Sequence, residues 1–201
     1  MSDNPQQKAV LVGFGTLLLQ ESLGDTIGAD GAKTKRFRPV IIQNYRRLFN
    51  LLPDHYPAIV VNKLREDQSE VAAANVEPAE GFTFNGLAYE VDANDLENLD
   101  KRERYYLRQE VEYSDFYTGE PLGKCFVYES DPNARWIERS IDKMLPLWRD
   151  IVYARVGAYR IGEDFGKYYD ATTYLADGKT LMVDFYREHL AALLDLDAIR
   201  K

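Results

Sequence analysis

The sequence predicts an α+β fold in which strands come first and helices follow. Between residue 8 and about residue 130 the apolar segments are short and rich in Val, Ile, Phe and Tyr, with turn residues between them, which is typical of strands. From residue 131 onward, apolar residues recur at helical spacing. The 201 residues, 45% of them hydrophobic, are enough for one compact domain with an extension.

The first apolar run, "KAVLVGFGTLLL", begins like a buried strand and breaks where two glycines surround Phe14. Glycine lets a chain turn sharply or approach a ligand closely, so the break is either a plain bend or a binding loop. The loop lacks the third glycine of the G-x-G-x-x-G fingerprint and the G-K-[ST] of a P-loop, which argues against nucleotide binding. Its backbone N–H groups, freed from strand pairing, are candidates to hold carboxylate or carbonyl oxygens.

Further strands are predicted along the β-rich part, at "PVIIQ", "AIVVNK", "FTFNGLAYEV", "LRQEVEY" and "KCFVYE". The segment "DFYTGEPLGKCF" is punctuated by Gly119, Pro121 and Gly123. It is therefore expected to form a hairpin or a longer connection between strands.

One helix is predicted inside the β-rich part, within "DANDLENLDKRERYY" at residues 92–106. The apolar period changes there from two to about 3.6. Asp92 or Asn94 is suited to cap the first turn, because a short polar side chain can accept a free backbone N–H. Leu96 and Leu99 mark the apolar stripe of this helix.

Glu103 is the first candidate for catalysis. At about 100° per residue it falls about 20° from Leu96, so its carboxylate is expected to point inward. Lost hydration raises the pKa of such a carboxyl group and makes it a candidate general base. Asp100, about 40° from Leu96 on the same count, competes for this role. A purely structural alternative is that Glu103 pairs with Arg102 or Arg104 at the helix end.

The last third is predicted to be helical. Asp131 and Pro132 are typical of a cap and a first helical turn. The apolar residues that follow at helical spacing are Ile137, Ile141, Leu145, Trp148 and Val152. Pro146 should kink or split this segment, and Gly162 and the "ADGK" turn mark further breaks. A last helix is expected to hold Phe185, Leu190, Leu193 and Leu194.

Charge and composition argue against several classes of function. Lys and Arg total 25 against 33 Asp and Glu, a net charge of −8, and no basic block is long enough to follow a phosphate backbone, so no nucleic-acid partner is expected. No apolar run reaches the roughly 18 residues that span a bilayer, and "MSDNPQQK" is unlike a leader, so we expect no membrane and a cytoplasmic location. Cys125, His55 and His189 have no metal-ligand spacing, so no metal site or His-centred nucleophile is expected.

Four pieces of the sequence, in their order and spacing, resemble the γ-glutamyl cyclotransferase family. That family has a loop like Tyr-Gly-Ser-Leu after its first strand, then a basic-aromatic segment, a long strand segment, and a helix ending in Leu-Asp-x-x-Glu with tyrosine close behind. The matching pieces here are "FGTL" (14–17), "NYRRLFN" (44–50), "NVEPAEGFTFNGLAYEV" (75–91) and "LDKRE" (99–103), followed by Tyr105 and Tyr106.

The resemblance implies a small mixed β-barrel with surrounding helices over residues 1–130. Residues 131–201 are then a C-terminal helical extension packed on the same core. It also implies that the glycine loop and Glu103 meet at the barrel mouth, with Glu103 as the base. The implied substrate-binding residues are Phe14, Gly15, Thr16, Leu17 and Tyr106.

The implied reaction is an intramolecular aminolysis. The α-amine of a γ-glutamyl compound attacks its own γ-carbonyl, releases the attached amino acid or amine, and closes the lactam 5-oxoproline. Because the nucleophile is tethered to its target, little catalytic apparatus is required, and no cofactor is implied. Glutathione, γ-glutamyl dipeptides and γ-glutamylamines share the reacting half, so the resemblance implies a small-molecule substrate class and not one leaving group.

The chain departs from the family pattern at two loop positions. Phe14 replaces tyrosine, which keeps the ring and loses a phenolic hydrogen bond of about 1 kcal/mol. Thr16 replaces serine and keeps the hydroxyl. The helical extension is a further difference, and three roles are open for it: covering the barrel mouth, extending the core, or forming the face of a homodimer. Two other functions stay open, a non-catalytic binding module on this fold and an interaction protein that works through its helices.

Overall fold

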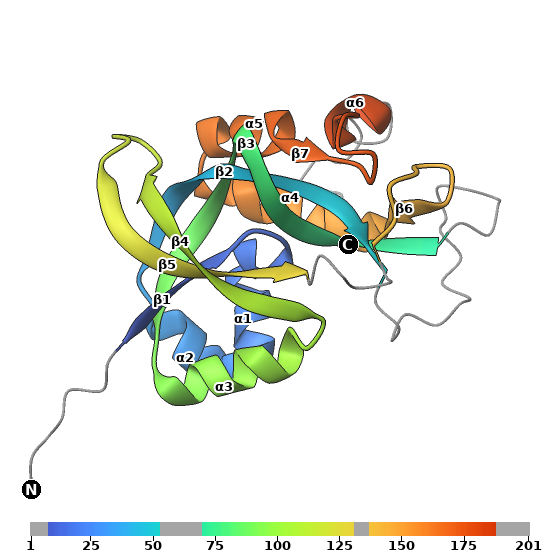
Figure 1. Ribbon diagram of the computed structural model, residues 1–201. Helices are drawn as coiled ribbons and strands as arrows, with labels where there is room; N and C mark the ends of the chain where they lie inside the picture. Colours follow the sequence, from blue (N-terminus) through green and yellow to red (C-terminus); the bar gives the residue numbers. More distant parts are fainter. Residues whose placement is uncertain (1–7, 53–69, 131–136, 188–201) are drawn as a thin grey trace, which may run out of the picture.

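Five strands close a small mixed barrel in the computed structural model, which describes residues 8–52, 70–130 and 137–187 (Figure 1). They are β1 (Ala9–Gly13), β2 (Phe37–Leu51), β3 (Glu70–Val91), β4 (Tyr106–Asp115) and β5 (Pro121–Ser130). Hydrogen bonds join them in the order β3-β1-β5-β4-β2, and β2 pairs back with β3. Only β1 and β5 pair in parallel within this ring of described strands. The predicted α+β fold with a small mixed barrel is confirmed.

The register of the long β2–β3 pair shifts at irregular points along its length. One of them lies at Asn44, which has a φ of 59°. Asparagine tolerates this left-handed conformation better than most residues, and its side chain accepts a hydrogen bond from the Gly81 N–H at 3.2 Å. Such a bulge bends a strand locally, so two long strands can wrap around a small barrel.

The hairpin predicted from the glycine and proline pattern is confirmed between β4 and β5. Asp115 holds its turn, because the carboxylate accepts the N–H groups of Tyr117 and Thr118, both at 3.0 Å. Gly119 completes the turn with a φ of 72°. The hairpin places the start of β4 beside the end of β5, and Tyr106 pairs with Ser130 there.

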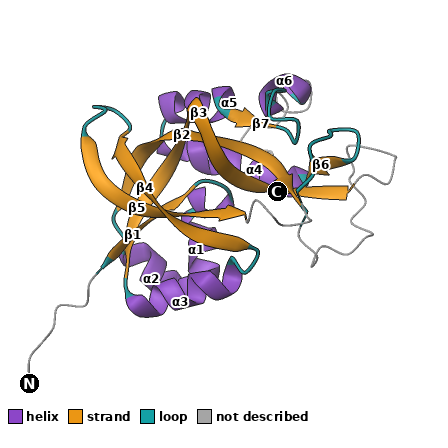
Figure 2. Ribbon diagram, in the orientation of Figure 1, coloured by secondary structure: helices purple, strands orange, loops and turns teal. Residues whose placement is uncertain are grey.

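The helices lie in two groups on either side of the barrel (Figure 2). One group contains α1 (Gln20–Ile27), α2 (Ala29–Thr34) and α3 (Ala93–Arg102). The other contains α4 (Trp148–Ile161), α5 (Glu163–Ala171) and the short α6 (Met182–Phe185). The predicted cap of α3 is Asp92, whose side chain accepts the N–H groups of Asn94 and Asp95 at 2.9 Å.

The helical prediction was wrong for residues 137–147. Ile137 forms an isolated bridge with Leu51, and Leu145 lies in β6 (Met144–Pro146), which pairs in parallel with the start of β3. Proline has no N–H and pushes the preceding residue out of the helical conformation, so the residues next to Pro146 are extended and pair with β3, after a turn at residues 141–143. The helix begins only at Trp148. The break at Gly162 and the "ADGK" turn are confirmed.

The helices α4 and α5 share their apolar core with the barrel. Ile151, Ala154 and Phe165 belong to the same buried cluster as Phe49 of β2 and Leu87 of β3. A short strand, β7 (Thr173–Tyr174), also pairs with β2. The helical part is therefore anchored to the barrel by side-chain packing and by backbone hydrogen bonds.

Some of the predicted features lie outside the described residues. These are the strand at "AIVVNK", the cap at Asp131 and Pro132, both histidines, and Leu190, Leu193 and Leu194. Within the ranges described, none of the helices combines the length and the hydropathy needed to cross a bilayer.

Candidate active site

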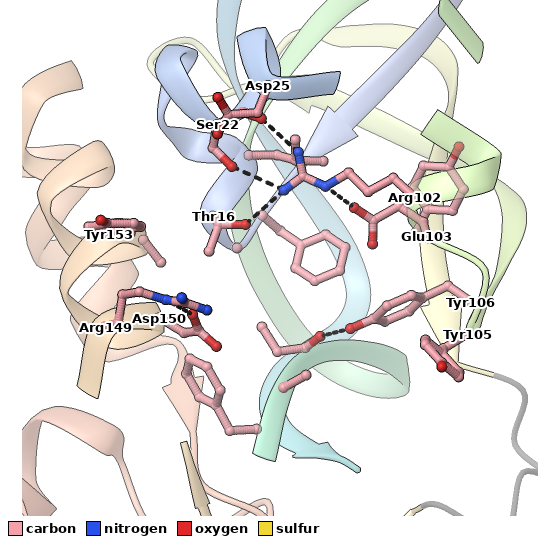
Figure 3. Close-up of a pocket in the computed structure, with 18 of the residues that line it drawn as sticks. Thr16, Ser22, Asp25, Arg102, Glu103, Tyr105, Tyr106, Arg149, Asp150 and Tyr153 are labelled. Carbon is pink, nitrogen blue, oxygen red and sulfur yellow. Dashed lines mark hydrogen bonds and ion pairs between the residues drawn. The ribbon is translucent and has the colours of Figure 1, made fainter. Parts of the chain in front are cut away.

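A pocket of about 380 Å³ opens where the loop after β1, the end of α3 and the first turns of α4 come together (Figure 3). All six residues that the sequence pointed to line this pocket: Phe14, Gly15, Thr16, Leu17, Glu103 and Tyr106. They come from segments about ninety residues apart in the chain. The fold brings them together because β1 pairs with β3, and the chain runs from β3 directly into α3.

The glycine loop turns sharply and leaves donors free. After Gly13 the chain enters η1 (Thr16–Leu18), one turn of 3₁₀ helix. A Cβ on Gly13 would lie 2.7 Å from the Cβ of Leu17, so only glycine permits this turn. Within the described part of the chain, the N–H groups of Gly15, Thr16 and Leu17 donate to no acceptor. The loop is therefore a bend that also offers three backbone donors to an oxygen atom in the pocket.

Glu103 ends α3 and turns its side chain into the pocket. Its backbone N–H donates to the Leu99 carbonyl at 2.8 Å, and the side chain keeps 18% of its surface exposed. Arg102 Nε contacts one carboxylate oxygen at 3.0 Å. The other oxygen has no protein partner among the described residues (Figure 3). Burial raises the pKa of Glu103, and the neighbouring Arg102 opposes that rise.

Both expectations for Glu103 therefore hold at once: the carboxylate points inward and also pairs with an arginine. Asp100, the competing carboxylate, does not line the pocket. It accepts hydrogen bonds from Arg108 Nη1 at 2.8 Å and from the Tyr128 hydroxyl at 2.7 Å. This leaves Glu103 as the acidic side chain at the junction of α3 and the loop.

Tyr106 and Phe14 are two of the aromatic residues that line the barrel side of the pocket. The Tyr106 hydroxyl donates to the Ala74 carbonyl at 2.6 Å, which fixes the tyrosine ring as a wall. Phe14 is 8% exposed and packs edge-on against Phe84 with ring centroids 5.8 Å apart. Most of the Phe14 ring therefore belongs to the barrel core, and its exposed part lines the pocket.

The opposite wall comes from α4, in the helical extension. Arg149 and Asp150 point into the pocket from this helix (Figure 3), Tyr153 of the same helix also lines it, and Ser22 and Asp25 of α1 complete the rim. Sequence reasoning left covering the barrel mouth open as a role of the extension and named none of these residues. Arg149 and Tyr153 are four residues apart, as are Asp150 and Ala154, so these residues lie on one face of the helix. The sequence shows this spacing, but it indicates a shared face only once the helix is known to begin at Trp148.

Other reactive groups lie elsewhere. Burial raises the pKa of the Cys125 thiol to about 12, and Cys125 packs in the barrel core outside the pocket. Within the ranges that the structure describes, no cluster of three or more His, Cys, Asp or Glu side chains is arranged to hold a metal ion. The chemistry available at the pocket is thus that of carboxylates, arginines, backbone donors and tyrosine hydroxyls, with Glu103 as the carboxylate next to the glycine loop and α3.

The comparison with solved structures identifies the fold. An uncharacterized protein from Homo sapiens superposes with a TM-score of 0.59 at 16% identity, over 82% of this chain and 88% of that one. A protein described as "Gamma-glutamyl cyclotransferase" gives 0.57 at 14% identity, over 83% and 88%. YkqA from Bacillus subtilis gives 0.58 at 15% identity, over 80% of this chain and 52% of that one. No curated protein sequence matches this chain.

The sequence profile of one protein family covers most of the barrel and the loop and helix that carry Gly15 and Glu103. It spans residues 11–144, more than half of the chain, and is described as "Gamma-glutamyl cyclotransferase, AIG2-like". The chain belongs to the AIG2-like γ-glutamyl cyclotransferase family.

Proposed function

We propose that this protein is an enzyme that converts a γ-glutamyl amino acid, peptide or amine to 5-oxoproline and the free amine. The observation that carries this proposal is the meeting, in one pocket, of a Glu103 oxygen and the N–H groups of Gly15, Thr16 and Leu17, none of which has a partner among the described residues. The pocket volume of about 380 Å³ falls in the range of roughly 300–1,000 Å³ that is usual for small-molecule sites.

The proposed mechanism begins with deprotonation of the substrate. The α-ammonium group gives a proton to the free Glu103 oxygen and becomes a nucleophilic amine. A buried carboxylate with a raised pKa is suited to this step, because its proton affinity is closer to that of the amine. The amine nitrogen then attacks the γ-carbonyl carbon of the same molecule, which makes the step effectively unimolecular.

The attack places a negative charge on the former carbonyl oxygen. The backbone donors of the glycine loop are proposed to stabilise this oxyanion, since they are fixed by the turn and need no reorganisation. Collapse of the intermediate breaks the amide C–N bond as the leaving nitrogen takes the proton from Glu103. The carboxylate then accepts the surplus proton of the ring nitrogen and passes it to the released amine, which departs as an ammonium ion. The five-membered lactam remains, and the carboxylate is restored.

The test is to incubate the protein with a panel of γ-glutamyl amino acids, dipeptides and amines and to measure 5-oxoproline by mass spectrometry. Glu103→Gln should lower turnover at least about a hundredfold, because the amide keeps the shape but cannot take a proton. Glu97→Gln is the matched control: Glu97 lies on the same helix, is exposed, and pairs with Lys101 at 2.7 Å.

Absence of 5-oxoproline from every member of the panel would refute the enzyme function. If γ-glutamyl compounds then bind in calorimetry without turnover, the binding-module alternative is favoured. Turnover by Glu103→Gln close to that of the unsubstituted protein would exclude Glu103 as the base.

A further inference from the structure

Arg102 stands between Glu103 and the glycine loop, and all of its hydrogen-bond donors are used. A guanidinium group carries five N–H donors in a rigid, planar fork. Nε contacts Glu103 at 3.0 Å. Nη1 donates to the Ser22 carbonyl and to Thr26 Oγ1, both at 2.7 Å, and Nη2 donates to Ser22 Oγ at 3.0 Å and to Thr16 Oγ1 at 3.2 Å. No donor is left over to bind a substrate.

These contacts join three separate parts of the site. The arginine belongs to the last turn of α3, its Nη1 partners belong to α1, and Thr16 begins the turn that carries the free N–H groups. Because the guanidinium fork is planar, the contacts of its Nη atoms with α1 also fix the direction of the Nε–H group. This group contacts one oxygen of Glu103, so the position of that oxygen is fixed as well. Figure 3 shows the second oxygen on the pocket side of this pair.

The same pair opposes the effect of burial on the charge of the carboxylate. The other ionisable groups that surround Glu103 or line its pocket are Tyr89 of β3, Tyr128 of β5, Tyr105 and Tyr106 at the start of β4, Asp25 of α1, and Arg149, Asp150 and Tyr153 of α4. Burial raises the pKa of both Tyr89 and Tyr128, so these hydroxyls stay neutral. Among the described residues, Arg102 is the cation within ion-pair distance of Glu103, and it favours the ionised form that a base requires.

We propose that Arg102 is a positioning residue of the site: its guanidinium keeps Glu103 ionised, aims the free oxygen into the pocket, and holds the glycine loop through Thr16. This inference rests on the proposed function, because it assigns Arg102 a part in the same reaction. Arg102 touches no reacting atom. It acts through the base and through the loop.

The test compares Arg102→Gln and Arg102→Lys by the pH dependence of kcat/KM. The acid limb of this profile reports the ionisation of the base in the free enzyme. Loss of the charge in Arg102→Gln should move that limb upward by about one pH unit or more, since an opposite charge within about 4–6 Å lowers a carboxyl pKa by about 1–3 units. Lysine restores a charge with three donors and without the fork, so Arg102→Lys should recover most of the acid limb and still have a lower kcat.

Lys101→Gln is the matched control. It removes one positive charge from the neighbouring, exposed position, whose partner is Glu97. Its acid limb should stay in place, because solvent screens an exposed charge. Acid limbs at the same pH in all three variants and the unsubstituted protein would overturn the proposal. A purely structural role would also overturn it. In that case Arg102→Lys and Arg102→Gln would lose the same stability, and the acid limbs of their kcat/KM profiles would not differ.

A second readout separates this inference from the proposed function. The Glu103 carboxyl carbon can be titrated directly by NMR in the unsubstituted protein and in Arg102→Gln, without any substrate. If the protein forms no 5-oxoproline, the enzyme function fails, but a higher Glu103 pKa in the variant still supports the pairing. If turnover is present and the Glu103 pKa is unchanged in the variant, only the role of Arg102 fails.

Discussion

Gly157 of α4 lies directly against the backbone of Leu18 in η1. A Cβ added at Gly157 would stand 2.8 Å from the Leu18 carbonyl carbon and 2.9 Å from its Cβ. This contact joins the helical extension to the turn that carries Thr16 and Leu17. Arg149 and Tyr153, two turns and one turn earlier in the same helix, form the far wall of the pocket. The width of the pocket therefore depends on how closely α4 approaches η1.

Gly157→Ala should loosen this packing. The added methyl group meets backbone atoms that cannot move alone, so we expect a loss of about 1–3 kcal/mol in the free energy of unfolding. It should also weaken substrate binding, because α4 is pushed away from the loop. Denaturation in urea and steady-state kinetics measure the two effects. Gly31→Ala is the control: its Cβ would lie 3.8 Å from Ile27, and alanine should stabilise α2 by about 0.5 kcal/mol. Equal effects at both glycines would contradict the role given to the α4 contact.

The pH dependence of activity follows from the environment of Glu103. Burial raises the pKa of this carboxyl above its ordinary value of 4.5, with Arg102 opposing the rise. The base works only when ionised, so activity should fall as the pH falls through the raised pKa, and the midpoint of the acid limb of kcat/KM should lie above 4.5. A profile measured on a γ-glutamyl substrate in buffers of constant ionic strength checks this. A midpoint at or below 4.5 would mean that Glu103 is not buried as described, or that another group limits the rate.

The parts of the site that depend on local chemistry were predictable from the sequence. The cap at Asp92 and the inward direction of Glu103 follow from helical periodicity within fifteen residues. The sharp turn after Gly13 follows from the missing side chain of glycine, which lets Leu17 approach closely. The ordered family pattern then linked the loop to the helix, which no local rule could do.

The α4 wall and β6 were not predictable in this way. Apolar residues at helical spacing favoured a helix before Pro146, kinked or split at that proline, but the residues around Pro146 gain more by pairing with β3. That gain depends on a strand more than sixty residues earlier, and local periodicity carries no information about it. The approach of Tyr153 to the pocket depends in turn on the packing of α4 against η1.

Arg47 should prove important for stability. It is completely buried in β2, where Nη1 donates to the Asn85 carbonyl at 2.7 Å and Nε to Thr173 Oγ1 at 2.9 Å. Its guanidinium lies 3.9 Å from the centroid of the Tyr169 ring in α5, and Nη1 also reaches the Phe14 carbonyl at 3.4 Å. Burial lowers its pKa to about 10, so it stays a cation at neutral pH.

Lysine at this position keeps the charge and loses the fork. Arg47→Lys leaves buried acceptors without donors, and we expect a loss of about 2 kcal/mol or more in the free energy of unfolding, measured in urea. Arg160→Lys is the control, because Arg160 pairs with Glu21 at 2.9 Å, both side chains are exposed, and lysine can keep an ion pair there. Its effect should stay below about 1 kcal/mol. A larger loss at Arg160 than at Arg47 would show that the buried fork does not anchor α5 to the barrel.

The α4 wall should affect substrate choice more than the chemical step. If the γ-glutamyl end lies against the loop and Glu103, the leaving group extends toward Tyr153, which lines the pocket on the opposite side (Figure 3). Tyr153→Ala should then raise KM for a γ-glutamyl dipeptide severalfold, with kcat nearly unchanged, because an interaction shared by the ground and transition states acts on binding alone. The KM for γ-glutamyl methylamide should hardly change, since that leaving group is too short to reach α4.

Tyr117→Ala, at an exposed tyrosine outside the pocket, controls for the loss of a surface ring. A fall in kcat for both substrates would place Tyr153 near the reacting atoms and reverse this orientation of the substrate.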